Sequence, residues 1–347
     1  MNDNTVYIIG AGASQEVNLP TGYELKRMIA ELLDMDFDYD KQTRGDRLIV
    51  MALREYVKQS DDRRGDINPY LEEAQHIKDA MPQAISIDNF IDTQKGKDAL
   101  ALCGKLSIIR AILKSEKDSL LYFKKDHVDS TIQFGALENT WYLPFFQLIT
   151  ENCGKDDLEG RLKSISLIVF NYDRCIEHFL LYAFKNYYRV SEQEASKLVS
   201  YINIYHPYGK VGHLPWQDPN NATEYGETPK ALKLLKLVES IKTFTEGTNP
   251  DSSDIVQIKE EINNAERLVF LGFAFHKLNM EFLKPKNVSQ LDKTHRKVFA
   301  TALGMSLSDK NIVISQINGL FKNAVYSELS NLTCKKLFSE FWRSLSF

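Results

Sequence analysis

The sequence lacks the positive excess, the long apolar segment and the clustered cysteines that mark three common classes of protein. Its 43 Lys and Arg residues against 47 Asp and Glu residues give a net charge of −4, so we do not expect direct binding of nucleic acid. No stretch approaches the roughly 18 consecutive apolar residues of a membrane-spanning helix, so no membrane association is expected. The four cysteines stand far apart, without a CxxC pair or a Cys/His cluster, so we expect neither a metal site nor a disulfide.

What the sequence does contain describes a folded globular chain. Hydrophobic residues make up 43% and charged residues 26% of its 347 positions. At roughly 150 residues per domain, this length allows about two domains or one larger unit with an insertion. The polar start at Met1 runs directly into apolar residues 6–9, without the leader and cleavage site of a secretion signal. We therefore expect a cytoplasmic protein with reduced thiols.

Four short apolar runs, rich in β-branched residues, predict buried strands. They span residues 6–9, 166–170, 268–271 and 298–302. None alternates between apolar and polar positions, and a strand that is apolar on both sides belongs in a parallel sheet covered on each face by helices. The sequence therefore predicts an α/β fold, a Rossmann-like parallel sheet with helices on both faces.

Helical periodicity fills the segments between these runs. Residues 173–187 and 231–241 place apolar side chains at spacings of three and four, which predicts amphipathic helices. The interval between the first two predicted strands is far longer than one crossover helix requires, and much of it is charged and helical in pattern. We expect a mostly helical insertion at residues 40–160 within a single domain that spans residues 1–347.

A glycine-rich turn follows the first predicted strand and precedes a helix-like run at residues 23–33. It reads Gly10-Ala11-Gly12-Ala13-Ser14. Strand, glycine turn and helix in this order form a phosphate-binding arrangement, because glycines allow close backbone approach and free N–H groups attract an anion. The fingerprint GxGxxG would need a third glycine where the chain has Gln15, which argues against an ordinary dehydrogenase. The alternative is a tight turn without a ligand.

Polar or turn-forming residues also stand at the ends of later strand-like runs. Asn171 and Asp173 follow the second predicted strand, where open α/β sheets bind ligands, although Asp173 could instead close an Asx turn and cap the next helix. His206 ends a short β-like run, and an imidazole can accept a hydroxyl proton near neutral pH, but a lone histidine is more often structural. Gly272 follows the third predicted strand, where it could bring the backbone close to a ligand. Alternatively, it only turns the chain, and Phe273 is a core residue.

In this order the motifs resemble the sirtuin-like family of NAD-consuming proteins. The resemblance extends to Leu19-Pro20-Thr21-Gly22, to Ser86-Ile87-Asp88-Asn89-Phe90 and to residues 298–302. It implies that Gly10 to Ser14 hold the NAD phosphates and that the single domain is catalytic. It also implies that Asn171 aligns water or the ribose near C1′, that Asp173 holds the carboxamide and that His206 serves the ribose hydroxyls. Thr21 falls in the cofactor loop, and Gly272 and Phe273 border the adenosine half.

Departures from the family pattern narrow the expected activity. Sirtuin deacylases have a four-cysteine zinc ribbon and an Asp-Phe-Arg segment in the cofactor loop, and this chain has neither. It is more similar to the bacterial sirtuin-like NAD hydrolases of anti-phage defence, which cleave NAD to ADP-ribose and nicotinamide and so deplete NAD in an abortive infection. NAD is then the substrate, and no metal is needed. The alternatives are a non-catalytic module that senses NAD or ADP-ribose and, less favoured, a protein deacylase.

An NAD hydrolase of this type must be silent until infection. By analogy with the family, we expect control through a homo-oligomer or through a separate activator, for example a HerA-type ATPase. The sequence does not identify the trigger, the partner or the oligomer size. It also does not show whether NAD or its phosphorylated form is preferred.

Overall fold

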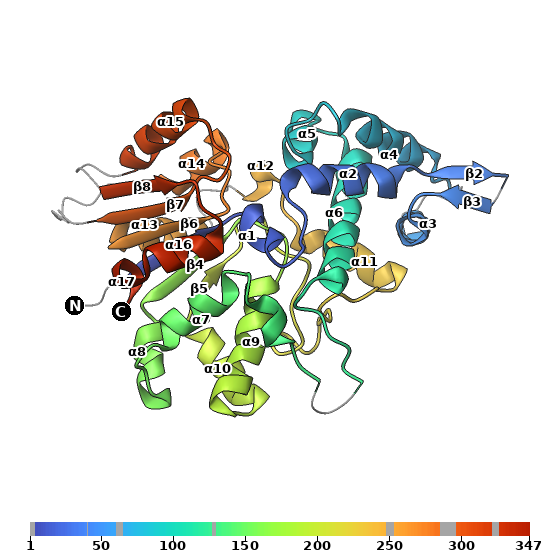
Figure 1. Cartoon of the computed structure of the whole chain (residues 1–347). Coiled ribbons are helices and arrows are strands. Elements are labelled where there is room, and N and C mark those ends of the chain that lie inside the picture. The colour runs from blue at the N-terminus through green and yellow to red at the C-terminus, as the bar shows by residue number, and fades with distance from the viewer. Residues whose placement is uncertain are drawn as a thin grey trace.

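A six-stranded parallel sheet forms the centre of the computed structural model (Figure 1). The structure describes residues 4–39, 41–59, 65–126, 130–247, 253–284, 296–320 and 326–347. In spatial order the strands are β5 Asn203–Tyr205, β4 Ile165–Val169, β1 Thr5–Ile9, β6 Arg267–Leu271, β7 Lys297–Thr301 and β8 Tyr326–Ser330. Each neighbouring pair is parallel. The predicted α/β fold with a Rossmann-like sheet is confirmed.

The three central strands end at the same level. Ile9 of β1 lies opposite Val169 of β4 and Leu271 of β6. The next residue on each strand therefore starts a loop at the same edge of the sheet. The chain leaves β1 toward β4 on one side and returns to β6 on the other, so this edge is also the point where the strand order reverses.

The sequence predicts four of the six strands as buried strands, and its short β-like run before His206 corresponds to β5, whereas β8 is missed; β5 and β8 lie at the edges of the sheet. Strand β5 has only three residues, none of them fully buried. Strand β8 reads Tyr-Ser-Glu-Leu-Ser and mixes polar with apolar residues. Because an edge strand needs less apolar cover than a central one, neither run has the composition that marks a buried strand.

Helices cover both faces of the sheet, as β1 illustrates. Tyr7 and Ile9 point into one core, and Val6 and Ile8 into the other. The first core is built with α1 Ala11–Gln15, η1 Phe134–Leu137, α7 Tyr142–Thr150, α8 Leu158–Leu162 after η2 Lys155–Asp157, α9 Cys175–Tyr188, α10 Glu192–Ser200, α16 Cys334–Glu340 and α17 Trp342–Leu345. The second is built with α13 Ser253–Asn264, α14 Lys277–Leu283 and α15 Leu307–Asn318.

A group of helices beside the sheet forms what we call the helical lobe (Figure 1). It comprises α2 Gly22–Leu33, α3 Arg47–Gln59, α4 Asn68–Ala80, α5 Ile87–Thr93, α6 Asp98–Asp118 and α11 Ala231–Leu237. The hairpin of β2 Asp36–Asp38 and β3 Lys41–Arg44 extends from it, and η3 Val238–Ser240 and α12 Phe244–Gly247 follow α11. Helix α6 packs against α2, α4 and α11. The lobe thus takes α2 from before residues 40–160 and α11 from after them, whereas α7 and α8 within that interval pack on the sheet.

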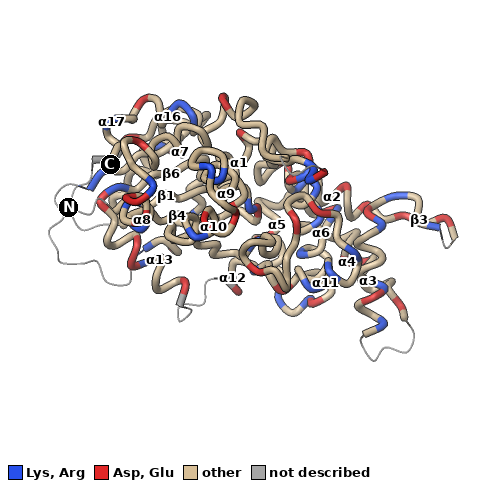
Figure 2. Tube along the Cα trace, turned by 90° about the horizontal axis from the view of Figure 1, so that it is seen from below, with Lys and Arg blue, Asp and Glu red and all other residues tan. Residues whose placement is uncertain are grey.

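The predicted helices at residues 23–33, 173–187 and 231–241 are confirmed as α2, α9 and α11 with η3. None of the described helices is both long and apolar enough to cross a membrane. Basic and acidic residues are mixed along the sheet part and the lobe (Figure 2).

A buried ion pair joins the lobe to the sheet part. Arg174, just before α9, and Glu116, in the last turn of α6, have fully buried side chains that lie 2.5 Å apart. The guanidinium also donates to the carbonyls of Thr223 and Glu224, and the amide of Gly226 donates to Glu116. Because a buried charge is stable only with such partners, this network fixes how the lobe meets the loop that follows β4.

Candidate functional site

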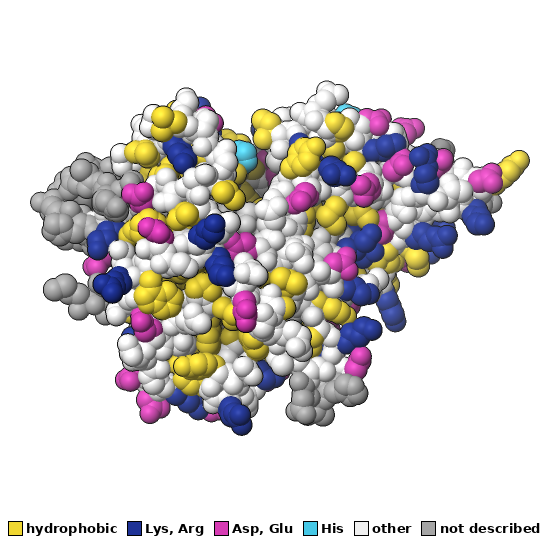
Figure 3. All heavy atoms as spheres, viewed as in Figure 1, with side chains coloured by type: hydrophobic (Ala, Val, Ile, Leu, Met, Phe, Trp, Pro, Cys, Tyr) yellow, Lys and Arg dark blue, Asp and Glu magenta, His cyan; other side chains and the backbone are white. Residues whose placement is uncertain are grey.

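A cleft of about 820 Å³ lies between the carboxyl ends of β1, β4 and β6 and the helical lobe. Figure 3 shows the molecule notched between these two parts. Of the residues that the sequence analysis proposes, those that line the cleft are Gly10, Ala11, Gly12, Thr21, Asn171, Asp173, Gly272 and Phe273. Ala13, Ser14 and His206 do not line it. The structure therefore brings motifs from three strands to one cavity, with three proposed residues just behind its wall.

The glycines are required where the β1 and β6 loops touch. A Cβ atom on Gly10 would lie 2.6 Å from the Gly272 carbonyl oxygen, and one on Gly12 would lie 2.9 Å from the Gly272 Cα. Gly272 itself has φ +54°, in the left-handed region. The amides of Gly10 and Gly12 donate to the carbonyls of Leu271 and Gly272. These two N–H groups are thus used by the fold, and the glycines serve close packing as well as access to the cleft.

Asn171 is held by the residue that ends the glycine turn. Its Nδ2 donates to Ser14 Oγ at 2.9 Å, and both side chains are buried. Ser14 therefore orients the amide from behind the cleft wall. With Nδ2 engaged in this way, the Asn171 carbonyl oxygen Oδ1 is the atom suited to accept a hydrogen bond from a water or a ligand hydroxyl.

His206 lies behind Asn171. Its Nδ1 is 3.3 Å from the backbone carbonyl oxygen of Asn171, and its Nε2 is 2.9 Å from Glu177 Oε1. Lys210 Nζ lies 2.7 Å from the same Glu177 oxygen. Both ring nitrogens thus face acceptors of the protein, and in this conformation His206 fixes the backbone at Asn171 instead of reaching into the cavity.

Glu177 is the centre of this cluster, and its charge is stabilised by Lys210 and by its contact with the His206 ring. Burial alone would raise the pKa of its carboxyl, but the charges and hydrogen bonds of Lys210 and His206 hold that pKa well below its usual value. The sequence analysis did not identify Glu177 or Lys210. The feature of the sequence that links them to the site is spacing, because each follows a proposed site residue by four positions: Glu177 follows Asp173, and Lys210 follows His206.

Asp173 and Thr21 have structural roles in addition to lining the cleft. Asp173 Oδ1 accepts from the Cys175 amide at 3.1 Å, so the Asx turn considered from the sequence is present, although the N-cap of α9 is Arg174. Thr21 caps α2 in a reciprocal capping box with Glu24. The hydroxyl of Thr21 is therefore already hydrogen-bonded when it borders the cleft.

The rest of the cleft lining comes from segments for which the sequence alone indicates no role. They supply Lys26 from α2, Ser86, Asp88 and Asn89 from the start of α5, Tyr208 after β5, and His276, Lys277 and Asn279 at α14. The motif at residues 86–90 was noted only as part of the family resemblance.

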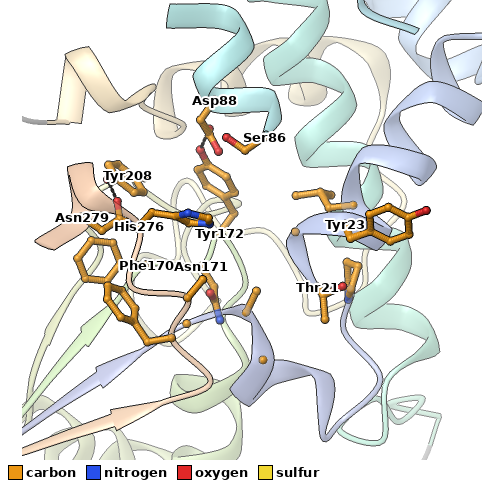
Figure 4. Close-up of a pocket in the computed structure, with 18 of the residues that line it drawn as sticks. Thr21, Tyr23, Ser86, Asp88, Phe170, Asn171, Tyr172, Tyr208, His276 and Asn279 are labelled. Carbon is orange, nitrogen blue, oxygen red and sulfur yellow. Dashed lines mark hydrogen bonds between the residues drawn. The ribbon is translucent and has the colours of Figure 1, made fainter. Parts of the chain in front are cut away.

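Aromatic rings and hydrogen bonds connect the two sides of the cleft. Phe170 packs against both Phe273 and Tyr208, with ring centroids 5.1 and 5.6 Å apart. Tyr208 donates to Asn279 Oδ1 at 2.5 Å. Tyr172 reaches from the loop after β4 to Asp88 on α5, and its hydroxyl donates to that carboxyl (Figure 4). The cavity therefore has a mainly apolar wall with a few directed polar groups, as binding sites for small organic molecules do.

The fold and the cleft define an α/β protein with a Rossmann-like sheet and a cavity at its topological switch point. No protein-family model and no curated protein matches the chain. Among the described residues, no three His, Cys, Asp or Glu side chains gather as a metal site, and all four cysteines are free thiols.

Proposed function

We propose that this protein hydrolyses NAD at the bond between nicotinamide and ribose, releasing nicotinamide and ADP-ribose. The observation that carries the proposal is the convergence of the glycine turn, Asn171 and Gly272 on one cleft at adjacent strand ends. Ligands of open α/β sheets bind at this position. The cavity volume lies within the range that holds small molecules and cofactors.

In the proposed complex, the dinucleotide crosses the sheet edge from β4 to β6. The phosphates lie against the backbone at residues 10–12, which borders the cleft. Because the Gly10 and Gly12 amides donate within the fold, these two N–H groups are not available to the phosphates. Asp173 accepts from the nicotinamide carboxamide, and Thr21 borders the same cleft from α2. Gly272 and Phe273 border the adenosine half.

The chemistry asked of the protein is mainly placement. Nicotinamide is a good leaving group, and cleavage at C1′ passes through an oxocarbenium-like state, as in glycoside hydrolysis. Orienting water and ribose in one complex can contribute roughly 7–11 kcal/mol in favourable cases. Asn171 is the residue proposed to align the water or the ribose. His206, held by Glu177, which pairs in turn with Lys210, keeps the Asn171 backbone in place.

The biological setting is proposed from the sequence resemblance alone. In that setting the protein acts in the cytoplasm as an anti-phage NAD hydrolase. A homo-oligomer or a separate activator, such as a HerA-type ATPase, keeps it silent until infection.

The test is incubation of the purified chain with NAD, with and without a candidate activator, followed by quantification of nicotinamide and ADP-ribose. We expect Asn171→Ala to lower the turnover at least 100-fold, because an oriented side chain at the reacting centre is lost. Asn220→Ala, at an exposed loop position outside the cleft, is the matched control. Unchanged turnover by a folded Asn171→Ala variant would contradict the assignment.

A second candidate function is a module that binds NAD or ADP-ribose without cleaving it. It is favoured by the position of His206, whose two ring nitrogens both face protein acceptors. Saturable binding of NAD by calorimetry, with no nicotinamide released even with activator and trigger present, would identify this function.

A further inference from the structure

Asp88 lacks the basic partner that several other buried or partly buried acids of the protein have. Glu116 pairs with Arg174, Glu177 with Lys210, and Asp46 with Arg110. Asp88 lines the cleft, yet the described residues provide it with no basic partner. Its hydrogen bond comes from the neutral hydroxyl of Tyr172.

The surroundings of Asp88 compensate a negative charge only in part. Burial raises the pKa of the Asp88 carboxyl to about 6, the Tyr172 hydrogen bond opposes this rise, and Asp92 on the same helix adds to it. Nearby rings of Phe170 and Tyr208 make this part of the wall apolar. A carboxyl in such a place gains most from a ligand that brings a positive charge.

The contact with Tyr172 locates Asp88 along the cleft. Tyr172 stands between Asn171 and Asp173, the two residues proposed to contact the nicotinamide ribose and the carboxamide. Its side chain reaches across the cavity to Asp88, while Asn171 and His276 border the same space (Figure 4). The Asp88 carboxyl therefore belongs to the end of the cleft where the scissile bond is proposed to lie.

We propose that Asp88 is a specificity residue that recognises the positive charge of the oxidised nicotinamide ring. This inference rests on the proposed function and adds to it the residue that distinguishes oxidised NAD from NADH, whose ring is neutral. During cleavage the bond from C1′ to the ring nitrogen breaks, its electron pair leaves with nicotinamide, and the positive charge moves to the ribose. An ionised Asp88 then stabilises the cation both before and during this step.

Calorimetric affinities for oxidised NAD and NADH test the proposal without relying on turnover. They are measured at pH 7.5 in the Asn171→Ala background, so that oxidised NAD stays intact. We expect this protein to bind oxidised NAD about tenfold more tightly than NADH, the effect of one partly buried charge interaction. Adding Asp88→Asn, which preserves size and hydrogen bonding, should reduce the ratio to about one.

Asp98→Asn is the matched control, because Asp98 is also an acid in the first turn of a helix but is exposed and outside the cleft. It should leave the ratio unchanged. If the starting protein binds both forms equally, or if Asp88→Asn keeps the preference, the inference is wrong and the proposed function stands. If neither oxidised NAD nor NADH binds, even to the protein with Asn171 intact, the inference and the proposed function are both wrong.

A pH series on the protein with Asp88 intact gives an answer even if Asp88→Asn does not fold. The preference for oxidised NAD should be present above about pH 6 and disappear as the pH falls through that value, because the carboxyl then becomes neutral. Other titratable groups around α5 and the cleft are Asp92, Tyr172, Tyr208, Asp173, His276, Lys26, Lys277, Tyr23, His76 beside Phe90, and the Lys105–Glu246 pair of α6 and α12. A ratio that does not change between pH 5 and pH 7.5 would overturn the proposal.

Discussion

The positioning of Asn171 depends on side chains that do not enter the cleft. Ser14 fixes its side-chain amide, His206 faces its backbone carbonyl, Glu177 holds the imidazole, and Lys210 pairs with Glu177. Glu177 contributes the only negative charge of this group, and its Oε2 is buried without a hydrogen-bond partner among the described residues. Its carboxylate is therefore stabilised by Lys210 and by the His206 ring and not by solvent.

Replacing Glu177 with Gln should destabilise the protein in a pH-dependent way. The folded-state pKa of Glu177 lies below its usual value near 4.5. The ionised carboxylate therefore stabilises the protein above pH 4.5, and this stabilisation is lost as the pH falls toward the folded-state pKa. At pH 7 we expect Glu177→Gln to lose about 3 kcal/mol of unfolding free energy, since the partly buried Lys210 is left without a counterion. The deficit should shrink in urea titrations at pH 4.

The same variant separates positioning from general destabilisation. In assays well below the unfolding temperature, kcat should fall while KM changes little, because Asn171 is displaced but the phosphate contacts remain. Exposed Glu192→Gln, which breaks a surface pair with Lys185, is the control. An equal urea midpoint for Glu177→Gln and the unmodified protein at pH 7 would rule out this account of the cluster.

At the scale of elements, the loop after β6 and the first turn of α1 are packed backbone to backbone. Gly272 has φ +54°, and a Cβ atom there would lie 2.0 Å from the Ala13 amide nitrogen. Gly272→Ala should therefore cost more than the roughly 1–2 kcal/mol of left-handed strain and should move the glycine turn away from the cleft. Urea unfolding and NAD binding measure the two effects.

Gly304 is a matched position for this experiment. It also has positive φ, +73°, but a Cβ atom there would meet nothing within 4 Å. Gly304→Ala should show the backbone strain alone and retain NAD binding. Equal destabilisation by the two substitutions would mean that the β6 and α1 loops are not packed as tightly as described.

The elements also show which parts of the site can be predicted from sequence. Strand ends followed by Gly10, Asn171 and Gly272 are predictable, because double-sided apolar runs identify central parallel strands and such strands align their carboxyl ends. The cleft residues of α5 and α14 are not, because which face of a helix borders a cavity depends on how the lobe packs against the sheet. The position of His206 behind Asn171 depends on Glu177, which only the folded chain brings within reach.

At the scale of the whole molecule, the cleft has one wall on the sheet and one on the helical lobe, so a ligand that fills it should restrain both. ADP-ribose at 100 times its Kd should raise the unfolding free energy by about 2.7 kcal/mol, as mass action requires. The more specific readout is hydrogen exchange. Amides at residues 10–14 and 272–274 should be protected on ligand binding, and so should those at residues 86–90 of the lobe, where Ser86, Asp88 and Asn89 line the cavity.

Amides of α10 provide the reference for this experiment, because that helix packs on the sheet core and contributes no residue to the cleft. Their exchange at short times should not change with ligand. Protection confined to residues 10–14 and 272–274 would mean that the ligand lies on the sheet edge alone and that Asp88 does not face it. Protection of residues 86–90 that is lost in Tyr172→Phe would instead show that the Tyr172 hydroxyl couples the lobe to the loop after β4, since that hydroxyl donates the hydrogen bond to Asp88 across the cavity.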